Sequence, residues 1–209
     1  MDIFKALLKT HPALMNCLDD LKSAYACLCD TYERGGKVLV CGNGGSAADS
    51  EHIVGELMKG FKLKRELSET QRSAFSLYDN GEYIADNLQN ALPAISLVSQ
   101  TSLITAYLND VSANMLFAQQ VFAYAKKGDT LIALSTSGNS ENIITAARVA
   151  LSLDCRVISI TGEDGGKLKA DSTVCIRLPA REPYAVQEFT LPVYHALCAA
   201  IELRFFGER

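Results

Sequence analysis

His52 and Glu56 stand four residues apart in a segment whose residue pattern predicts a helix. Residues at this spacing project from the same side of a helix, so an imidazole and a carboxylate would share one face. Such groups can remove a proton from a substrate or serve as ligands to a metal ion. A glycine-rich turn lies just before the pair, and it indicates what kind of molecule would be held nearby.

The turn is Cys41-Gly-Asn-Gly-Gly-Ser46, between a predicted strand and a predicted helix. Its three glycines would let backbone N–H groups approach an anion closely, because no Cβ stands in the way. The hydroxyl of Ser46 would add a donor beside the positive end of the helix dipole. We therefore predict a phosphate-binding loop at this place.

Two common nucleotide-binding loops do not fit this turn. Its glycine spacing is not the G-x-G-x-x-G of dinucleotide-binding folds, and no acidic residue ends the next strand about 20 residues later. The turn also lacks the Gly-Lys-Ser/Thr ending of a P-loop. The sequence thus argues against an NAD site and against a nucleoside triphosphate site of these types.

A second turn, Ser135-Thr-Ser-Gly-Asn-Ser140, again lies between a predicted strand and a predicted helix. It offers four hydroxyl groups and the free N–H groups of the helix to one dianion. An ordinary helix cap needs fewer hydroxyls than this. The second turn is therefore a second candidate phosphate-binding element.

Predicted strands alternate with predicted helices along most of the chain. The strands are expected at 37–41, 92–98, 130–134, 155–161 and 172–178. The helices are expected at 46–60, 99–108, 112–126, 141–153 and 186–206. This order predicts an α/β fold with a doubly wound, mainly parallel five-stranded sheet between two layers of helices, and ligands beyond the carboxyl ends of the strands.

Two segments fall outside this alternation. Residues 1–34 have apolar positions at helical spacing and predict one or two amphipathic helices. Residues 62–90 form a long, charged and polar tract with weak helical periodicity. Because loops of this length are usually functional or mobile, we expect a surface insertion that covers either the bound ligand as a lid or the edge of a subunit.

Length and composition limit the classes of protein to consider. The chain of 209 residues suffices for one well-buried domain, and its net charge of −4, without runs of Lys and Arg, argues against nucleic-acid binding. We expect neither export nor a membrane span, because no stretch offers about 18 uninterrupted apolar residues. Seven cysteines form an odd set without metal-site spacing, which predicts reduced, mostly buried thiols and a cytoplasmic location.

Four sequence features in order resemble the sugar isomerase (SIS) domains that bind phosphosugars. They are the two turns, the helical His52-x-x-x-Glu56 pair, and Gln187-Glu followed after six residues by His195. Together they closely resemble the phosphoheptose isomerases, which convert sedoheptulose 7-phosphate to D-glycero-D-manno-heptose 7-phosphate. The resemblance runs from about residue 35 to 205. It implies a single SIS domain over 1–209 that assembles as a homotetramer, with sites built from more than one subunit.

The resemblance also implies roles for the residues that match the family. Glu56 would act as the base and His195 as the acid when a proton moves between C1 and C2 of the sugar through an enediol. The phosphate and sugar contacts would come from Asn43, Gly44, Ser46, Asn109, Asp110, Ser135, Thr136, Ser137, Ser140 and Gln187. One zinc ion per subunit would be held by His52, Glu56, Gln187 and His195, and would polarise the substrate carbonyl.

The chain departs from the family pattern in several places. Lys59-Gly-Phe61 stands where Gly-Arg usually follows the helical glutamate, so Lys59, Lys62 or Arg65 would have to supply that cation. Tyr184 replaces an acidic residue three positions before the glutamine. Pro192 lies shortly before His195, where it should remove a helical hydrogen bond and kink the helix.

Two other functions stay open at this stage. The chain could isomerise a different sugar phosphate. It could also be a non-catalytic SIS protein that binds a phosphosugar or a replication initiator and acts as a regulator. Relatives of that second kind lack the helical glutamate and the final histidine, both of which this chain has.

Overall fold

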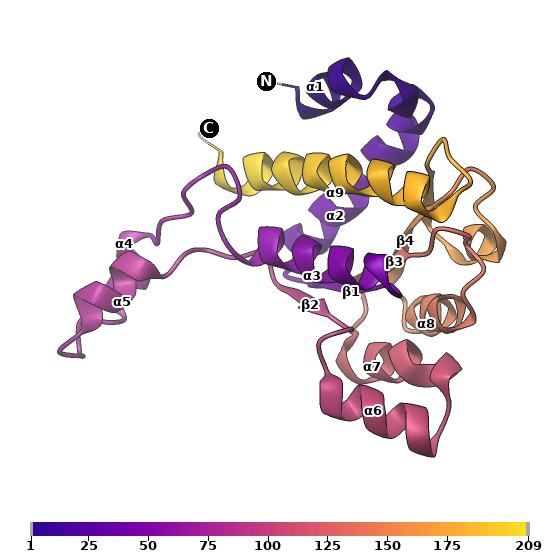
Figure 1. The fold of residues 1–209 in the computed structure, drawn as a ribbon. Coiled ribbons are helices and arrows are strands. Elements are labelled where there is room, and N and C mark those ends of the chain that lie inside the picture. The colour runs from indigo at the N-terminus through magenta and orange to yellow at the C-terminus, as the bar shows by residue number, and fades with distance from the viewer. Residues whose placement is uncertain (1, 208–209) are drawn as a thin grey trace.

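The computed structural model describes residues 2–207 and contains a parallel β-sheet between two layers of helices (Figure 1). The strands are β1 (Val38–Cys41), β2 (Ala94–Ser96), β3 (Thr130–Leu134), β4 (Arg156–Thr161) and β5 (Val174–Arg177). Their order is β2-β1-β3-β4-β5, and each adjacent pair is parallel. The predicted α/β sheet is confirmed, and it is fully rather than mainly parallel. Met1, Glu208 and Arg209, which belong to the predicted domain, lie outside the described residues.

Continuous apolar runs form the central strands because both faces of each strand are covered. Every residue of β1 and β3 is buried. Alternate side chains point to opposite faces, so Val38 and Val40 of β1 belong to one hydrophobic core while Leu39 and Cys41 belong to the other. Because all four strand pairings are parallel, the five strands point the same way. The turns that follow the strands therefore lie at one edge of the sheet.

The helices divide between the two faces of the sheet. One face is covered by α1 (Ile3–Thr10), η1 (Pro12–Cys17), α2 (Leu18–Glu33), α3 (Gly45–Met58) and α9 (Pro183–Phe206). The other face is covered by α6 (Thr101–Asp110), η2 (Ala113–Met115), α7 (Leu116–Tyr124), α8 (Glu141–Ser152) and η3 (Lys167–Asp171). The predicted three-layer arrangement is thus present.

Local chemistry explains where boundaries differ from the prediction. The strand expected at 92–98 begins only at Ala94, because Pro93 has no N–H to donate to the sheet. The helix expected at 112–126 is divided into η2 and α7, since the hydroxyl of Ser112 accepts a hydrogen bond from the Asn114 N–H and forms a tight turn.

The closing helix α9 packs against α1, α2 and α3. By length and composition it resembles a membrane-spanning helix, but 56% of its most apolar stretch is buried within the fold, as expected for a core helix. Pro192 does not interrupt it, and Figure 1 shows one continuous helix through this position. The helix is therefore continuous before His195, and the kink expected at Pro192 stays a prediction.

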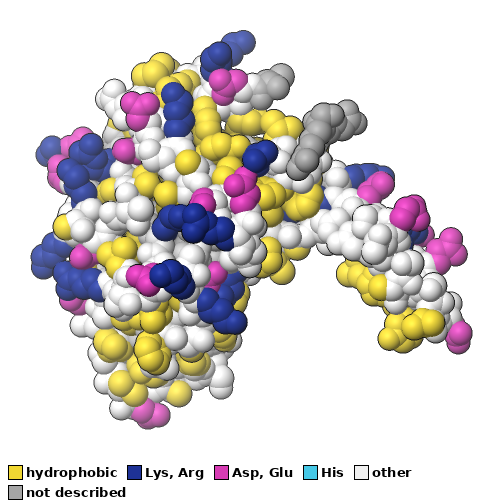
Figure 2. All heavy atoms as spheres, turned by 180° about the vertical axis from the view of Figure 1, so that it is seen from behind, with side chains coloured by type: hydrophobic (Ala, Val, Ile, Leu, Met, Phe, Trp, Pro, Cys, Tyr) yellow, Lys and Arg dark blue, Asp and Glu magenta, His cyan; other side chains and the backbone are white. Residues whose placement is uncertain are grey.

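The tract predicted as an insertion forms an arm that stands away from the body of the protein (Figure 1). It contains two short helices, α4 (Glu69–Ser73) and α5 (Gly81–Asn87), whose lengths explain the weak periodicity in the sequence. Arg72 of α4 joins them through a 2.5 Å contact with Asp86. Figure 2 shows hydrophobic side chains near the end of the arm. Leu77, which lies between α4 and α5, is 88% exposed. Its role as a lid or a subunit contact stays a prediction.

Candidate functional site

The two predicted phosphate turns meet at the carboxyl edge of the sheet. They follow β1 and β3, which lie side by side, whereas the chain visits β2 on the far side of β1 between them. Ligand sites in open α/β sheets lie at such a switch point. The side chains of Asn43 and Asn142 exchange two hydrogen bonds of 3.0 Å and tie the first turn to the start of α8. No sequence pattern pointed to Asn142.

The first turn delivers the chain into α3 in a conformation that requires glycine. Gly44 is the N-cap residue of α3 and has a φ of 57°, in the left-handed region. A Cβ on Gly45 would lie 2.5 Å from the side-chain nitrogen of Gln187, so the start of α3 and the first half of α9 are in close contact. Ser46 is buried directly behind the turn, where its N–H donates to the Asn43 carbonyl at 3.0 Å.

The hydroxyl-rich turn lies at the N-terminus of α8, as predicted. Ser140 is the N-cap residue of this helix, yet its side chain caps no backbone N–H. Its hydroxyl instead accepts from the buried Ser135 hydroxyl at 3.2 Å. Thr136 is partly exposed and Ser137 is exposed beside them. The positive end of the α8 dipole is therefore available to an anion, together with several hydroxyl groups.

A second group of polar side chains lies further along α3, where that helix packs against α9. The His52 Nε2 atom is 3.2 Å from Glu56 Oε1 and 3.4 Å from His195 Nε2. The possible donor atoms of the three residues all lie within 4.8 Å of one another. The side chain of Glu56 is only 13% exposed, and its Oε2 atom has no hydrogen-bond partner within residues 2–207. A buried, unpartnered carboxylate oxygen of this kind calls for a cation or a donor from a ligand.

The three side chains fit a divalent metal ion. Two imidazoles and a carboxylate are common zinc ligands that leave a position open for substrate. The Tyr194 hydroxyl lies 2.8 Å from His52 Nδ1 and holds the ring so that Nε2 faces the group. Burial, and then the neighbouring His52, lower the pKa of His195 below its ordinary value, which favours the neutral ring that a metal requires. The identity of the metal as zinc stays a prediction.

The structure places the remaining predicted residues elsewhere. The side chain of Gln187 lies beside Gly45. Gly45 is seven residues before His52 on α3, which is about 10 Å along the helix axis. Asn109 and Asp110 end α6 on the opposite face of the sheet, where their side chains bond each other at 2.7 Å. The roles of Gln187 as a fourth metal ligand and of Asn109 and Asp110 as sugar contacts stay predictions.

The structure also distinguishes among Lys59, Lys62 and Arg65, the three residues that could replace the cationic side chain of the family pattern. Arg65 is excluded as a substrate contact because it is buried and bonded to Glu202. Lys59 is exposed and its Nζ donates to the Gly60 carbonyl. Lys62 lines a hollow of about 430 Å³ that also includes His195 and His11. Among the three candidates, Lys62 is therefore the cation that shares a cavity with the predicted acid.

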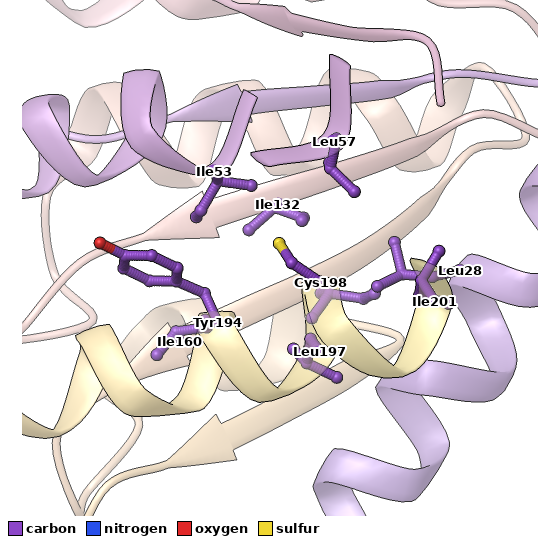
Figure 3. Close-up of a pocket in the computed structure, with 10 residues that line it drawn as sticks. Leu28, Ile53, Leu57, Ile132, Ile160, Tyr194, Leu197, Cys198 and Ile201 are labelled. Carbon is purple, nitrogen blue, oxygen red and sulfur yellow. The ribbon is translucent and has the colours of Figure 1, made fainter. Parts of the chain in front are cut away.

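A separate apolar cavity lies deeper between α3 and α9 (Figure 3). Its volume is about 10 Å³, and its lining includes Ile53, Leu57 and Leu197. The ring of Tyr194 borders this cavity, while its hydroxyl points away from it (Figure 3). An apolar space of this size is a packing gap between the helices and the sheet, not a site for a sugar.

Comparisons with known proteins identify the family and the fold. Family models described as SIS domain match residues 7–73 and 94–203. The phosphoheptose isomerase of Citrifermentans bemidjiense is 35% identical over 207 residues, which is 97% of this chain and 95% of that protein.

Two solved structures of phosphoheptose isomerases are similar over nearly the whole chain. The enzyme from Neisseria gonorrhoeae has a TM-score of 0.72 and 32% identity, and the enzyme from Francisella tularensis has a TM-score of 0.73 and 30% identity. In both cases the match covers 95% of this chain and 94% of the other. The expected family and fold are confirmed.

Proposed function

Because the chain belongs to the phosphoheptose isomerase family of SIS-domain proteins, we propose that it interconverts sedoheptulose 7-phosphate and D-glycero-D-manno-heptose 7-phosphate. One observation carries the proposal. The helix α3 begins at a phosphate-type turn and presents His52 about 10 Å further along its axis, beside Glu56 and His195. This separation suits an extended seven-carbon sugar, whose phosphate is at the opposite end from C1 and C2.

In the proposed reaction, the phosphate is held by the two turns at the carboxyl edge of the sheet. Ser135, Thr136, Ser137 and Ser140 would donate to it together with the N-terminus of α8. Asn43, Gly44 and Ser46 of the first turn would contact phosphate or sugar hydroxyls. Holding this distant end fixes the reacting carbons near α9, which replaces a chance encounter by a positioned one.

Glu56 would then move the proton between C1 and C2. Its carboxylate is buried but leaves Oε2 without a partner within residues 2–207, so this atom is free to accept a proton from carbon. His195 would transfer the proton between the two oxygens, and its lowered pKa keeps a neutral ring available near neutral pH. A metal ion held by His52, Glu56 and His195, with Gln187 as the proposed fourth ligand, would polarise the carbonyl.

The first test is turnover of sedoheptulose 7-phosphate with and without added zinc. We expect Glu56→Gln and His195→Ala each to lower kcat by roughly 10²–10⁴-fold, because each removes an acid–base group. Glu51→Gln is the matched control, since Glu51 is an exposed carboxylate on the same helix that bonds Ser99. Equal turnover by the native protein and both site variants would show that these residues do not carry the reaction.

A different sugar phosphate is the second candidate substrate. Two departures favour keeping it: Tyr184 stands at a usually acidic position, and Lys62 is the only proposed replacement for the family cation that lines the hollow beside His195. A panel of pentose, hexose and heptose phosphates distinguishes the two. A non-catalytic regulator is disfavoured because Glu56, His52 and His195 are brought together.

Assembly and location belong to the same proposal. We keep the homotetramer that the family resemblance implies and the cytoplasmic location that the cysteine pattern predicts. The arm supports assembly, since its apolar side chains are exposed in the single chain. The location is supported by the thiols, because all seven cysteines lie within the described residues and are free.

A further inference from the structure

We propose that the buried ion pair between Arg65 and Glu202 positions the two helices that carry Glu56 and His195. Glu202 does not belong to the predicted site, Arg65 is considered there only as a substitute cation, and the two residues are 137 positions apart in the sequence. The inference rests on the proposed isomerase function for its kinetic consequence, but the arrangement of the helices can be measured without any substrate.

Arg65 secures the end of α3. Its side chain is fully buried, Nη2 donates to the Glu56 carbonyl at 2.9 Å, and Nη1 donates to the Leu57 carbonyl at 2.6 Å. Carbonyl groups at the end of a helix lack partners within the helix, and a cation is favoured there by the helix dipole. The guanidinium therefore holds the backbone of the proposed base itself.

Glu202 secures the facing helix and the segment that follows α3. It lies on α9 seven residues after His195, which places both on the same side of that helix. Its carboxylate is 1% exposed and accepts Arg65 Nε at 2.9 Å. It also accepts the N–H groups of Phe61, Lys62 and Leu63 at 2.7, 2.7 and 3.1 Å.

The consequences of this pair reach the site directly. The Phe61 ring lies 5.4 Å from the His195 ring, measured between centroids, and Lys62 lines the hollow beside His195. Both residues belong to the short segment whose backbone the Glu202 carboxylate holds. The pair therefore sets both the separation of the two helices and the side chains that border His195.

Apolar packing alone would not set this geometry. The contact between α3 and α9 includes apolar side chains around a small gap (Figure 3), and such contacts have no preferred direction. Two buried charges cost free energy unless they are paired and hydrogen-bonded, so they are a poor way to gain stability alone. The six hydrogen bonds of the pair and its partners are directional, and they suit a device that fixes relative position.

The test compares the double variant Arg65→Met/Glu202→Gln with Asp129→Asn. The double variant removes both charges, so no lone charge remains buried. Asp129 is a matched control, because its carboxylate is also buried and accepts the N–H groups of Lys37 and Lys126. The segments that it joins do not carry His52, Glu56 or His195. Arg65→Lys is a second test variant that keeps the charge but cannot reproduce the guanidinium fork.

Two readouts are needed, and circular dichroism confirms that each variant is folded. The first is the ring ¹⁵N NMR spectrum, which is simple because the chain has three histidines. We expect the His52 and His195 signals to shift in both Arg65 variants and to stay in Asp129→Asn. The second is kinetics, where we expect kcat to fall roughly 10–100-fold with KM within twofold, because the phosphate turns are untouched.

Unchanged His52 and His195 signals in a folded Arg65 variant would overturn the proposal, and so would equal changes in Asp129→Asn. If the native protein turns over no sugar phosphate, the proposed function fails while the NMR comparison still decides the positioning role. If the native protein is active and both Arg65 variants keep the native kcat, the pair is structural only.

Discussion

At the scale of single residues, contacts from His52 to Tyr194 and from Tyr194 to Asp49 orient the His52 ring toward Glu56 and His195. Tyr194 lies 2.8 Å from His52 Nδ1 and 3.3 Å from Asp49 Oδ1. Burial raises the pKa of the Tyr194 hydroxyl, so it stays protonated and can donate to Asp49. In the His52 tautomer that a metal would require, the Tyr194 hydroxyl would accept from a protonated Nδ1, and the lone pair of Nε2 would face the site.

The role of the Tyr194 hydroxyl can be tested by a substitution that removes only this oxygen atom. We expect Tyr194→Phe to weaken zinc binding by roughly 10–100-fold, because the ring of His52 loses its orienting partner. Competition with a chromophoric chelator measures the affinity. Tyr32→Phe is the matched control, since Tyr32 is also largely buried and its hydroxyl bonds only the Pro93 carbonyl at 3.4 Å. Native zinc affinity in Tyr194→Phe would contradict the role.

At the scale of elements, the hydroxyl-rich turn depends on its contact with the turn after β4. Gly138 has a φ of 64°, and a Cβ placed there would lie 2.1 Å from the Gly165 carbonyl oxygen. The N–H of Leu168 donates to the Gly138 carbonyl at 2.9 Å, which joins the two turns. Any side chain at this position must therefore displace the hydroxyl groups that we assign to the phosphate.

We expect Gly138→Ala to raise KM for the sugar phosphate at least tenfold. Gly128→Ala isolates the backbone cost, because Gly128 also has a positive φ of 89° but nothing lies within 4 Å of its added Cβ. Both variants should lose roughly 1 kcal/mol of stability from the left-handed conformation, and only Gly138→Ala should also lose affinity. Equal KM values for the two variants would show that the turn does not hold the phosphate.

The sequence predicts elements well where one physical signal dominates. The strand at 130–134 is predicted with its observed bounds, since it is apolar throughout and ends at a turn. Helix α4 is absent from the prediction because five residues cannot show a helical period. His52, Glu56 and His195 could be selected by spacing and resemblance. Tyr194 and Asn142, and the pairing of Arg65 with Glu202, could not be selected, because the partners are far apart in the sequence and become neighbours only on folding.

At the scale of the whole molecule, both hydrophobic layers contain thiols. Cys41 belongs to the layer beneath α7 and α8, and Cys17 belongs to the layer beneath α9. Burial raises the pKa of Cys41 from 9.0 to about 12 and that of Cys17 to about 11. Above pH 9 the unfolded chain therefore releases protons that the folded chain keeps, and the free energy of unfolding falls.

We expect the stability of the native protein to decline between pH 9 and 12, with Cys41 contributing up to about 1.4 kcal/mol per pH unit. The stabilisation by this thiol is complete below the unfolded pKa and is lost as pH rises toward the folded one. Denaturant titrations of the native protein and Cys41→Ala at several pH values measure the two slopes. Parallel slopes would show that the Cys41 thiol is accessible to water.

The arm is the other feature of the whole molecule, and trypsin can report on it cleanly. Arg72 is the only Lys or Arg between Arg65 and Lys126, so cleavage within this region occurs at one bond. The arm stands away from the body of the protein in Figure 1. We therefore expect cleavage at Arg72 to slow as protein concentration rises and subunits assemble, while sugar phosphate has no effect. Arg72→Gln is the control that removes the bond.

The alternative has an opposite signature in the same experiment. If the arm is a lid that closes over bound sugar, sugar phosphate should slow tryptic cleavage at Arg72. This protection should appear even at a protein concentration low enough to keep the chains apart. Light scattering on the same samples supplies the assembled mass, which should reach roughly four times the 22.7 kDa of one chain. Ligand protection without a change in mass would assign the arm to the site of its own subunit. Concentration-dependent protection that follows the mass would instead assign it to a contact between copies of the chain.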